Sequence, residues 1–341
     1  MQKVKLGLTG WCAATILVSA FLLFQVQPMI SKMILSWFGG SPAVWTTCML
    51  FFQVFLLAGY TYAHLLDRIK RTRTQAIIHL LLLVAALIAL PIVPDPSWKP
   101  ADGGQPQFRI LILLSATVGL PYFLLSASAP LVQAWYSRAF RGRSPYRFYA
   151  LSNFGSLVAL LSYPFFIEPR FDNPSQAGLW SSSFLAFALL SGGLAFVMAR
   201  WNLTADPSQS TEWEQNSASG QSPRISQYAL WMLLPAFGSL SLLAVTNQIC
   251  QDVAVVPFFW VVPLSIYLIT FIICFDRERW YFRGLFSVAT ILSVVTIASI
   301  LLKSQLQPRI DEFVARYDRI ADFLREKEIS YDLPDFLDSL T

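Results

Sequence analysis

The chain has 341 residues, of which 55% are hydrophobic and only 13% are charged, and its formal net charge is +5. Soluble domains carry about 25% charged residues, so this chain lacks the polar side chains needed to cover its own surface. Its Lys and Arg residues form no long basic tract, which argues against nucleic acid as a partner. The composition excludes an ordinary soluble domain and favours a protein whose partner is the lipid bilayer.

The apolar runs predict an all-α fold, a polytopic transmembrane helical bundle. A spanning helix needs about 20 predominantly apolar residues. About nine such runs occur, near residues 6–26, 42–66, 76–93, 109–132, 148–167, 178–199, 227–246, 254–275 and 284–302. Pro91 and Pro94 end the third run, while Pro121 and Pro130 lie inside the fourth. Prolines are tolerated within a bundle because neighbouring helices satisfy the freed carbonyl groups.

Basic residues occupy every second connector between these runs. Lys3 and Lys5 precede the first run. The later basic connectors contain Arg68, Lys70, Arg71 and Arg73; Arg138, Arg141, Arg143 and Arg147; Arg200 and Arg224; and Arg277, Arg279 and Arg283. Because positive residues favour the cytoplasmic side, this alternation predicts a cytoplasmic N-terminus. Nine spans would then leave residues 303–341 outside.

The sequence predicts four regions. Residues 1–200 form a first six-helix membrane bundle, and residues 226–302 add three further membrane helices. Residues 201–225 are rich in Ser, Gln, Asn and Glu and have too little apolar surface to fold, so they predict a flexible cytoplasmic linker. Residues 303–341 predict an amphipathic tail that begins at Pro308. Its apolar face consists of Ile310, Phe313, Val314, Tyr317, Ile320, Ala321 and Leu324. The tail either packs on the bundle or lipid surface, or begins a larger domain.

The chain contains no P-loop, no His-Glu-x-x-His motif and no Gly-x-Gly-x-x-Gly turn. Its four cysteines, Cys12, Cys48, Cys250 and Cys274, form no metal-ligand spacing. His64 and His79 are isolated from other candidate ligands along the sequence. We therefore predict no catalytic residue, no metal site and no cofactor, and an enzymatic function is not expected.

Polar residues near predicted helix ends are the candidate site. Ionisable groups at membrane depth are costly, so they are functional candidates by default. Gln25 and Gln27 close the first predicted helix, with Lys32 nearby, and the seventh closes on Asn247, Gln248, Gln251 and Asp252. In a pseudo-symmetric bundle these two helices are equivalent, so their ends are predicted to line one cavity for a small polar or cationic solute. The alternative is that these groups are interfacial caps in contact with water. Other charged residues near the predicted outer ends are Glu168, Arg170 and Asp172.

Three stretches together resemble the membrane region of bacterial spermidine-synthase-like fusion proteins. They read WFGGSPAVW at residues 37–45, YALSNFGSL at 149–157 followed by LSYP at 161–164, and TNQICQDVAVVP at 246–257. The resemblance implies a multi-pass protein of the bacterial cytoplasmic membrane, the cell inner membrane, with a link to polyamines. In that family the bundle precedes a soluble domain similar to aminopropyltransferases. The Gly-rich turn of that domain is missing here, so its catalytic residues have no counterparts in this chain.

A second resemblance is to the major facilitator superfamily, in which six helices, a cytoplasmic linker and six more helices follow one another. Asp-Arg pairs at Asp67-Arg68 and Asp276-Arg277 stand after the second and eighth predicted helices. This implies a six-plus-three, major-facilitator-like arrangement and a transporter-like module for a small polar or cationic solute. The alternative hypothesis is a non-transporting membrane anchor, or partner, of a soluble synthase-like enzyme.

Overall fold

The computed structural model of the chain describes residues 2–99, 106–140, 145–201, 224–252, 258–276 and 282–326. Within these ranges the secondary structure is helical, and no strand is present. The elements in chain order are α1 (Gln2–Phe38), α2 (Pro42–Asp67), α3 (Thr72–Ile88), η1 (Pro96–Trp98), α4 (Pro106–Leu114), η2 (Ser115–Gly119), α5 (Leu120–Ala139), α6 (Tyr146–Ser162), η3 (Tyr163–Ile167), α7 (Asn173–Trp201), α9 (Ile225–Asp252), α10 (Phe258–Asp276) and α11 (Arg283–Glu326). The predicted linker, residues 201–225, lies almost wholly outside the described residues.

Seven of the described helices are long and apolar enough to cross a membrane, and two shorter apolar helices span Thr72–Ile88 and Val261–Phe275. The prediction of an all-helical fold is confirmed for the described residues, and seven of their helices could cross a membrane by length and composition. Whether all nine segments span, and whether they follow the major-facilitator arrangement, stays a prediction.

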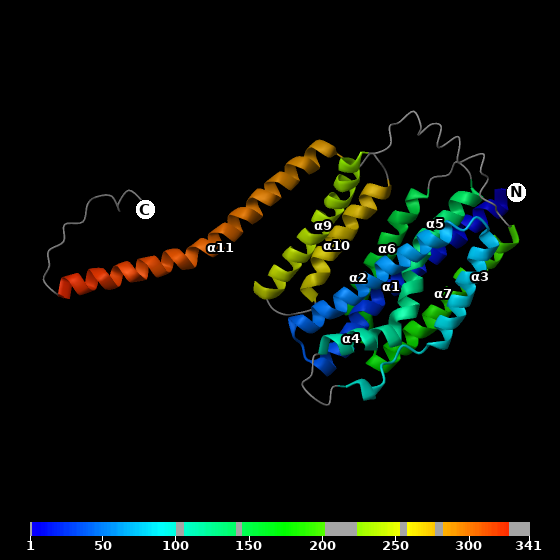
Figure 1. Cartoon of the computed structure of the whole chain (residues 1–341), viewed down its shortest axis with the longest axis horizontal. Coiled ribbons are helices and arrows are strands. Elements are labelled where there is room, and N and C mark those ends of the chain that lie inside the picture. The colour runs from blue at the N-terminus through cyan, green and yellow to red at the C-terminus, as the bar shows by residue number, and fades with distance from the viewer. Residues whose placement is uncertain are drawn as a thin grey trace. The chain divides into compact units, whose positions relative to one another are not determined.

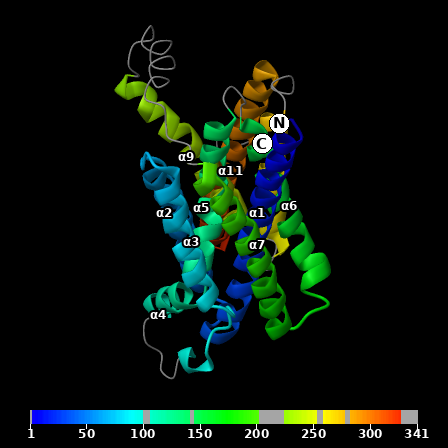
Figure 2. The same ribbon diagram turned by 90° about the vertical axis from the view of Figure 1, so that its right-hand side faces the viewer.

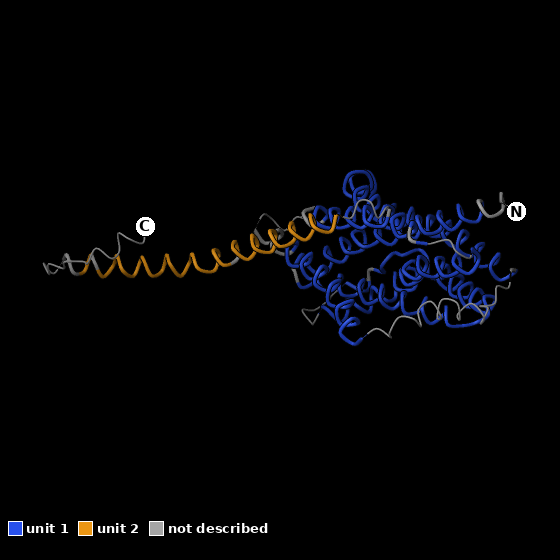
Figure 3. Tube along the Cα trace, turned by 90° about the horizontal axis from the view of Figure 1, so that it is seen from above, with its two compact units in different colours: residues 1–278 blue, residues 279–341 orange. Residues whose placement is uncertain are grey.

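The chain divides into two compact units, Met1–Glu278 and Arg279–Thr341 (Figure 3). In the first unit the long helices run alongside one another (Figures 1 and 2). α1 is its centre, because it packs against α2, α5, α6 and α7. α3 packs against α7 and α5, and α10 packs against α6 and α9. The second unit contains α11.

Two glycines allow close backbone contacts between helices of the first unit. A Cβ atom added to Gly59 of α2 would lie 2.8 Å from the carbonyl oxygen of Phe123 in α5. One added to Gly155 of α6 would lie 2.8 Å from the carbonyl oxygen of Leu17 in α1. Small residues let helix backbones approach in lipid, where the hydrophobic effect does not drive helices together. These two glycines therefore define where α2 meets α5 and where α6 meets α1.

Two boundaries differ from the sequence prediction. α1 does not close at Gln25 and Gln27 but continues through Pro28 to Phe38. The proline costs one backbone hydrogen bond, which a helix embedded among neighbours tolerates. Likewise, α11 runs as one helix through Pro308, where a separate tail segment was expected to begin.

Candidate functional site

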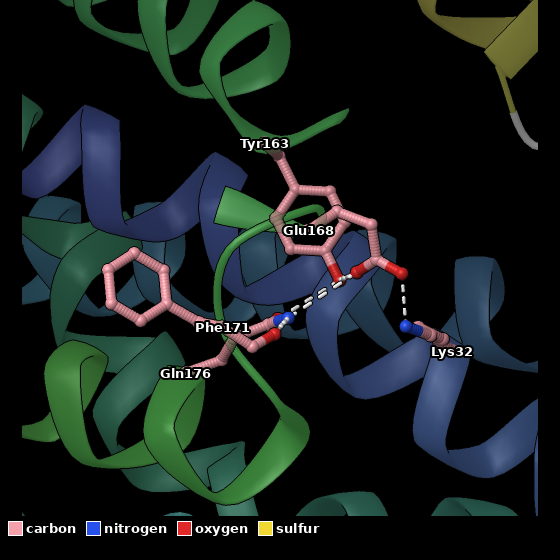
Figure 4. A network of polar contacts seen from close by, with 5 residues as sticks. All are labelled: Lys32, Tyr163, Glu168, Phe171 and Gln176. Atoms are coloured by element: carbon pink, nitrogen blue, oxygen red, sulfur yellow. Dashed lines mark hydrogen bonds and ion pairs between the residues drawn. The ribbon is translucent and has the colours of Figure 1, made fainter. Parts of the chain in front are cut away.

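A polar network surrounds Glu168, the residue that follows η3 (Figure 4). Lys32 of α1 forms an ion pair with one carboxylate oxygen of Glu168. The hydroxyl group of Tyr163 donates to the other oxygen at 2.9 Å, and Gln176 Nε2 of α7 lies 3.4 Å from the same oxygen. Gln176 Nε2 also donates to the carbonyl oxygen of Phe171 at 2.8 Å, which fixes the amide beside the carboxylate. The network joins α1, the end of α6 and the start of α7.

A π-helical turn brings Tyr163 and Glu168 together. Residues five apart in a regular α-helix with 3.6 residues per turn point in clearly different directions. In η3 the backbone N–H of Glu168 donates to the carbonyl oxygen of Tyr163 at 2.9 Å, a bond across five residues. Pro164 lies inside this turn and has no N–H with which to continue the α-helical pattern. The wider turn places the tyrosine hydroxyl against the carboxylate, and such turns occur often at functional sites.

The electrostatics of the network favour an ionised Glu168. Partial burial disfavours the carboxylate form and by itself raises the pKa. The hydrogen bonds from Lys32, Tyr163 and Gln176 and the charge of Lys32 outweigh that effect and hold the pKa of Glu168 below its ordinary value of 4.5. The Lys32 side chain is 48% exposed and the Glu168 side chain 31%. The carboxylate is thus charged at neutral pH, oriented by three donors, and within reach of a small molecule.

Asp172 has a local structural role next to this network. Its carboxylate accepts the backbone N–H of Ser175 at 3.1 Å, at the start of α7. Hydrogen bonds from the side chain of Ser175 and from its backbone N–H lower the pKa of Asp172. Asp172 therefore fixes the first turn of α7, the turn that carries Gln176.

The three predicted site residues of α1 separate onto two sides of the helix. Gln27 donates to the hydroxyl group of Tyr122 in α5 at 3.1 Å. Lys32 instead reaches Glu168. Gln25 is buried, and it lies seven residues before Lys32, two turns away on the same face. Only Lys32 therefore enters the Glu168 network directly.

The four predicted residues of α9 cannot be placed in the same way. α9 ends at Asp252. The structure describes the backbone of Asn247, Gln248, Gln251 and Asp252 but not their side chains. Their convergence with the end of α1 remains a prediction.

Sequence reasoning missed Tyr163 and Gln176 and noted Glu168 only as a charged residue. The Tyr163-Pro164 pair inside an apolar run is the one available signal, because a proline there predicts a break in the α-helical hydrogen bonding. Gln176 gives no such signal, since one glutamine near a helix start is ordinary. Among the described residues, no three His, Cys, Asp or Glu side chains are placed to hold a metal ion.

Comparison with known proteins adds no relative: no protein-family model, no curated protein and no solved structure matches this chain.

Proposed function

We propose that the helical bundle is a transporter-like membrane module that binds a small polar or cationic solute at Glu168. The solute's ammonium group takes the place of the Lys32 ammonium group on the carboxylate. The observation that carries this proposal is the Lys32–Glu168 ion pair, which joins α1 to the end of α6.

The two partners of the ion pair are held differently. Glu168 is oriented by the Tyr163 hydroxyl and the Gln176 amide, and both remain in place when Lys32 leaves. Lys32 sits on a flexible four-carbon stem and is about half exposed. An incoming amine therefore meets a carboxylate that is already ionised and positioned, and has only a mobile lysine to displace.

Exchange of one ammonium group for another keeps the local charge balanced. An ionised carboxylate left alone in a partly buried place is costly, so Lys32 serves as the resting counter-ion when no solute is bound. This arrangement suits amines, including the polyamines that the family resemblance implies, and disfavours anions because they would have to displace Glu168. The likeness of the chain to membrane modules of synthase-like proteins supports the same solute class.

Binding of 1,4-diaminobutane to the protein in lipid nanodiscs tests the proposal, with 1,4-butanediol as the uncharged comparison. The wild type should bind the diamine and not the diol. Glu168→Gln should weaken binding at least about tenfold, the equivalent of ~1.4 kcal/mol. Lys32→Gln should preserve or strengthen binding because it removes the competing ammonium group.

Glu312→Gln, on exposed α11, is the matched control and should bind as the wild type does. Uptake of labelled diamine into proteoliposomes then separates a transporter from a binding module. Equal diamine binding by wild type and Glu168→Gln would contradict the proposed site. Absence of both binding and uptake would favour the anchor hypothesis.

A further inference from the structure

His79 of α3 is buried within the bundle, with 1% of its surface exposed, and its polar neighbours come from two other helices. Its Nε2 atom lies 3.0 Å from the Ser191 hydroxyl of α7. Its Nδ1 atom lies 3.4 Å from the Tyr62 hydroxyl of α2. The Trp135 ring of α5 meets the imidazole edge to face, with ring centroids 5.9 Å apart. The isolated histidine of the sequence is therefore the centre of a four-helix contact.

Both partners of the imidazole are hydroxyl groups, which can either donate or accept a hydrogen bond by rotating. A neutral imidazole offers one donor and one acceptor, so one hydroxyl donates to the ring and the other accepts from it. An imidazolium ion offers two donors, and both hydroxyl oxygens can then accept. Neither protonation state leaves a ring nitrogen of His79 without a partner. The pair Tyr62 and Ser191 thus accommodates a proton without breaking the contact.

The charged groups on the helices that contact His79 have other partners. On α2 and α5, Asp67 and Arg138 pair with each other. On α7, the Arg200 guanidinium lies over the Phe196 ring, 5.2 Å from its centroid. On α2, the remaining titratable groups are Cys48, Tyr60, Tyr62 itself and His64, which is exposed, and on α5 they are Tyr122 and Tyr136. In the described part of the chain, no carboxylate contacts His79, so no ion pair fixes it permanently in the charged form.

A neighbouring hydrogen bond holds α3 in register for this contact. Gln75, one turn before His79, accepts from Trp135 Nε1 at 2.8 Å. Its amide nitrogen also donates to the carbonyl oxygen of Ile69 at 2.7 Å. Residues four apart lie on the same helix face, so Gln75 and His79 both contact Trp135 of α5. The imidazole is positioned by rigid neighbours rather than by its own bonds alone.

We propose that His79, Tyr62 and Ser191 form a proton-binding site inside the bundle, separate from the Lys32–Glu168 network. Histidines within membrane-spanning helices take part in proton relays, and imidazole is the side chain whose unperturbed charge change lies nearest physiological pH. Here the proton would bind at a ring nitrogen of His79, and the hydroxyl of Tyr62 or Ser191 would turn from donor to acceptor. The inference does not depend on the solute or on the proposed function.

Nitrogen NMR of the protein in nanodiscs, with ¹⁵N-labelled histidine, tests the proposal. The chain has only two histidines, and His64→Gln, at an exposed position, leaves His79 as the single reporter. The imidazole resonances should move reversibly from the neutral toward the imidazolium position as the pH falls from 8 to 3. Helix content, followed by circular dichroism, should stay constant over the same range.

Two variants test the role of the hydroxyls. Ser191→Ala and Tyr62→Phe each remove one acceptor of the imidazolium, so the midpoint of the titration should fall by about one pH unit. Ser182→Ala, at an exposed position of the same α7 helix, is the matched control and should leave the midpoint unchanged. A resonance that stays neutral until the helices unfold would overturn the proposal. So would a midpoint that neither hydroxyl variant shifts.

Discussion

Helices α1 to α7 and helix α9 belong to one compact unit and are apolar enough to lie in a membrane, yet they differ sharply in packing. Within the most hydrophobic stretch of Pro106–Ala139, 61% of residues are buried, and within that of Gly7–Phe38, 44% are. The corresponding stretch of Ile225–Thr246 in α9 has none. Apolar composition therefore fixes which residues lipid can solvate, whereas packing depends on features that composition does not report.

The features that distinguish α1 to α7 from α9 are close backbone contacts and buried polar bonds. Gly59 and Gly155 let backbones of α2, α5, α6 and α1 approach, while nothing lies within 4 Å of a Cβ atom added to Gly238 of α9. α10 is intermediate, because Val261 and Leu268 are buried beside α6. In lipid such contacts supply much of the association energy. Matched substitutions, one at a buried position and one at an exposed position of α9, test this difference.

The largest effect is expected from Phe184→Ala. Phe184 of α7 is fully buried and stacks on Trp180, with ring centroids 5.5 Å apart. Truncation leaves a cavity, and the free energy of unfolding should fall by roughly 2 kcal/mol, below the soluble-protein range because lipid, not water, is the alternative surrounding. Unfolding by SDS in mixed micelles measures this. Phe237→Ala on α9, where the ring is 57% exposed, should change the value little.

Gly59→Ala should cost about 1–2 kcal/mol of unfolding free energy, because overpacking outweighs the gain in helix propensity. The new Cβ atom would meet the backbone of Phe123 at 2.8 Å, and a backbone atom cannot move aside as a side-chain tip can. Gly238→Ala should instead stabilise α9 slightly, since it has only the propensity gain. If both changes had the same sign, the contrast between α9 and the other helices would fail.

Trp135→Phe should lower the free energy of unfolding by about 1 kcal/mol, the scale of a single helix-to-helix hydrogen bond in a membrane. The fully buried indole donates to Gln75 at 2.8 Å, and the phenyl ring leaves that amide oxygen without its donor. Trp231→Phe on α9, where the indole is 57% exposed, is the control and should be near neutral. The same SDS titration compares the two variants.

The sequence predicts the helices better than it predicts their contacts. Each of the nine apolar runs overlaps a described helix, because an apolar run is a local property of the sequence. The third run continues past Ile88, where α3 ends, and residues 254–257 of the eighth lie outside the described residues. The boundaries fail where prolines are tolerated, as at Pro28 and Pro308. At Pro28 the packing of α1 against neighbouring helices, which the sequence does not display, allows the helix to continue.

The polar contacts could not be predicted, because their partners are far apart in the chain. Lys32 and Glu168 are separated by 136 residues, and His79 and Ser191 by 112. Periodicity places each residue on a helix face but does not say which helix that face meets. The Tyr163–Glu168 contact also requires a π-helical turn. Such a turn changes the direction in which the following side chains point, so a prediction from the α-helical period assigns them to the wrong helix face.

The smallest effect concerns one ion-paired carboxylate from each compact unit, Glu168 and Glu312. The pKa of Glu168 is lowered in the folded protein, so the carboxylate contributes stability that is present above its ordinary value of 4.5 and is lost as the pH falls through the folded-state pKa. Because the pair is partly exposed, its contribution at pH 7 should be only about 0.5 kcal/mol. Glu168→Gln should therefore unfold slightly more easily than wild type at pH 7, and the two should converge as the pH falls through the folded-state pKa of Glu168. Glu312 pairs with Arg316 within α11, but both side chains are at least 70% exposed, so Glu312→Gln should match wild type throughout. SDS unfolding at pH 7, 5 and 4 measures both. A pH-independent difference for Glu168→Gln would mean that the side chain acts through packing rather than through its charge, and Lys32 would then not be its electrostatic partner.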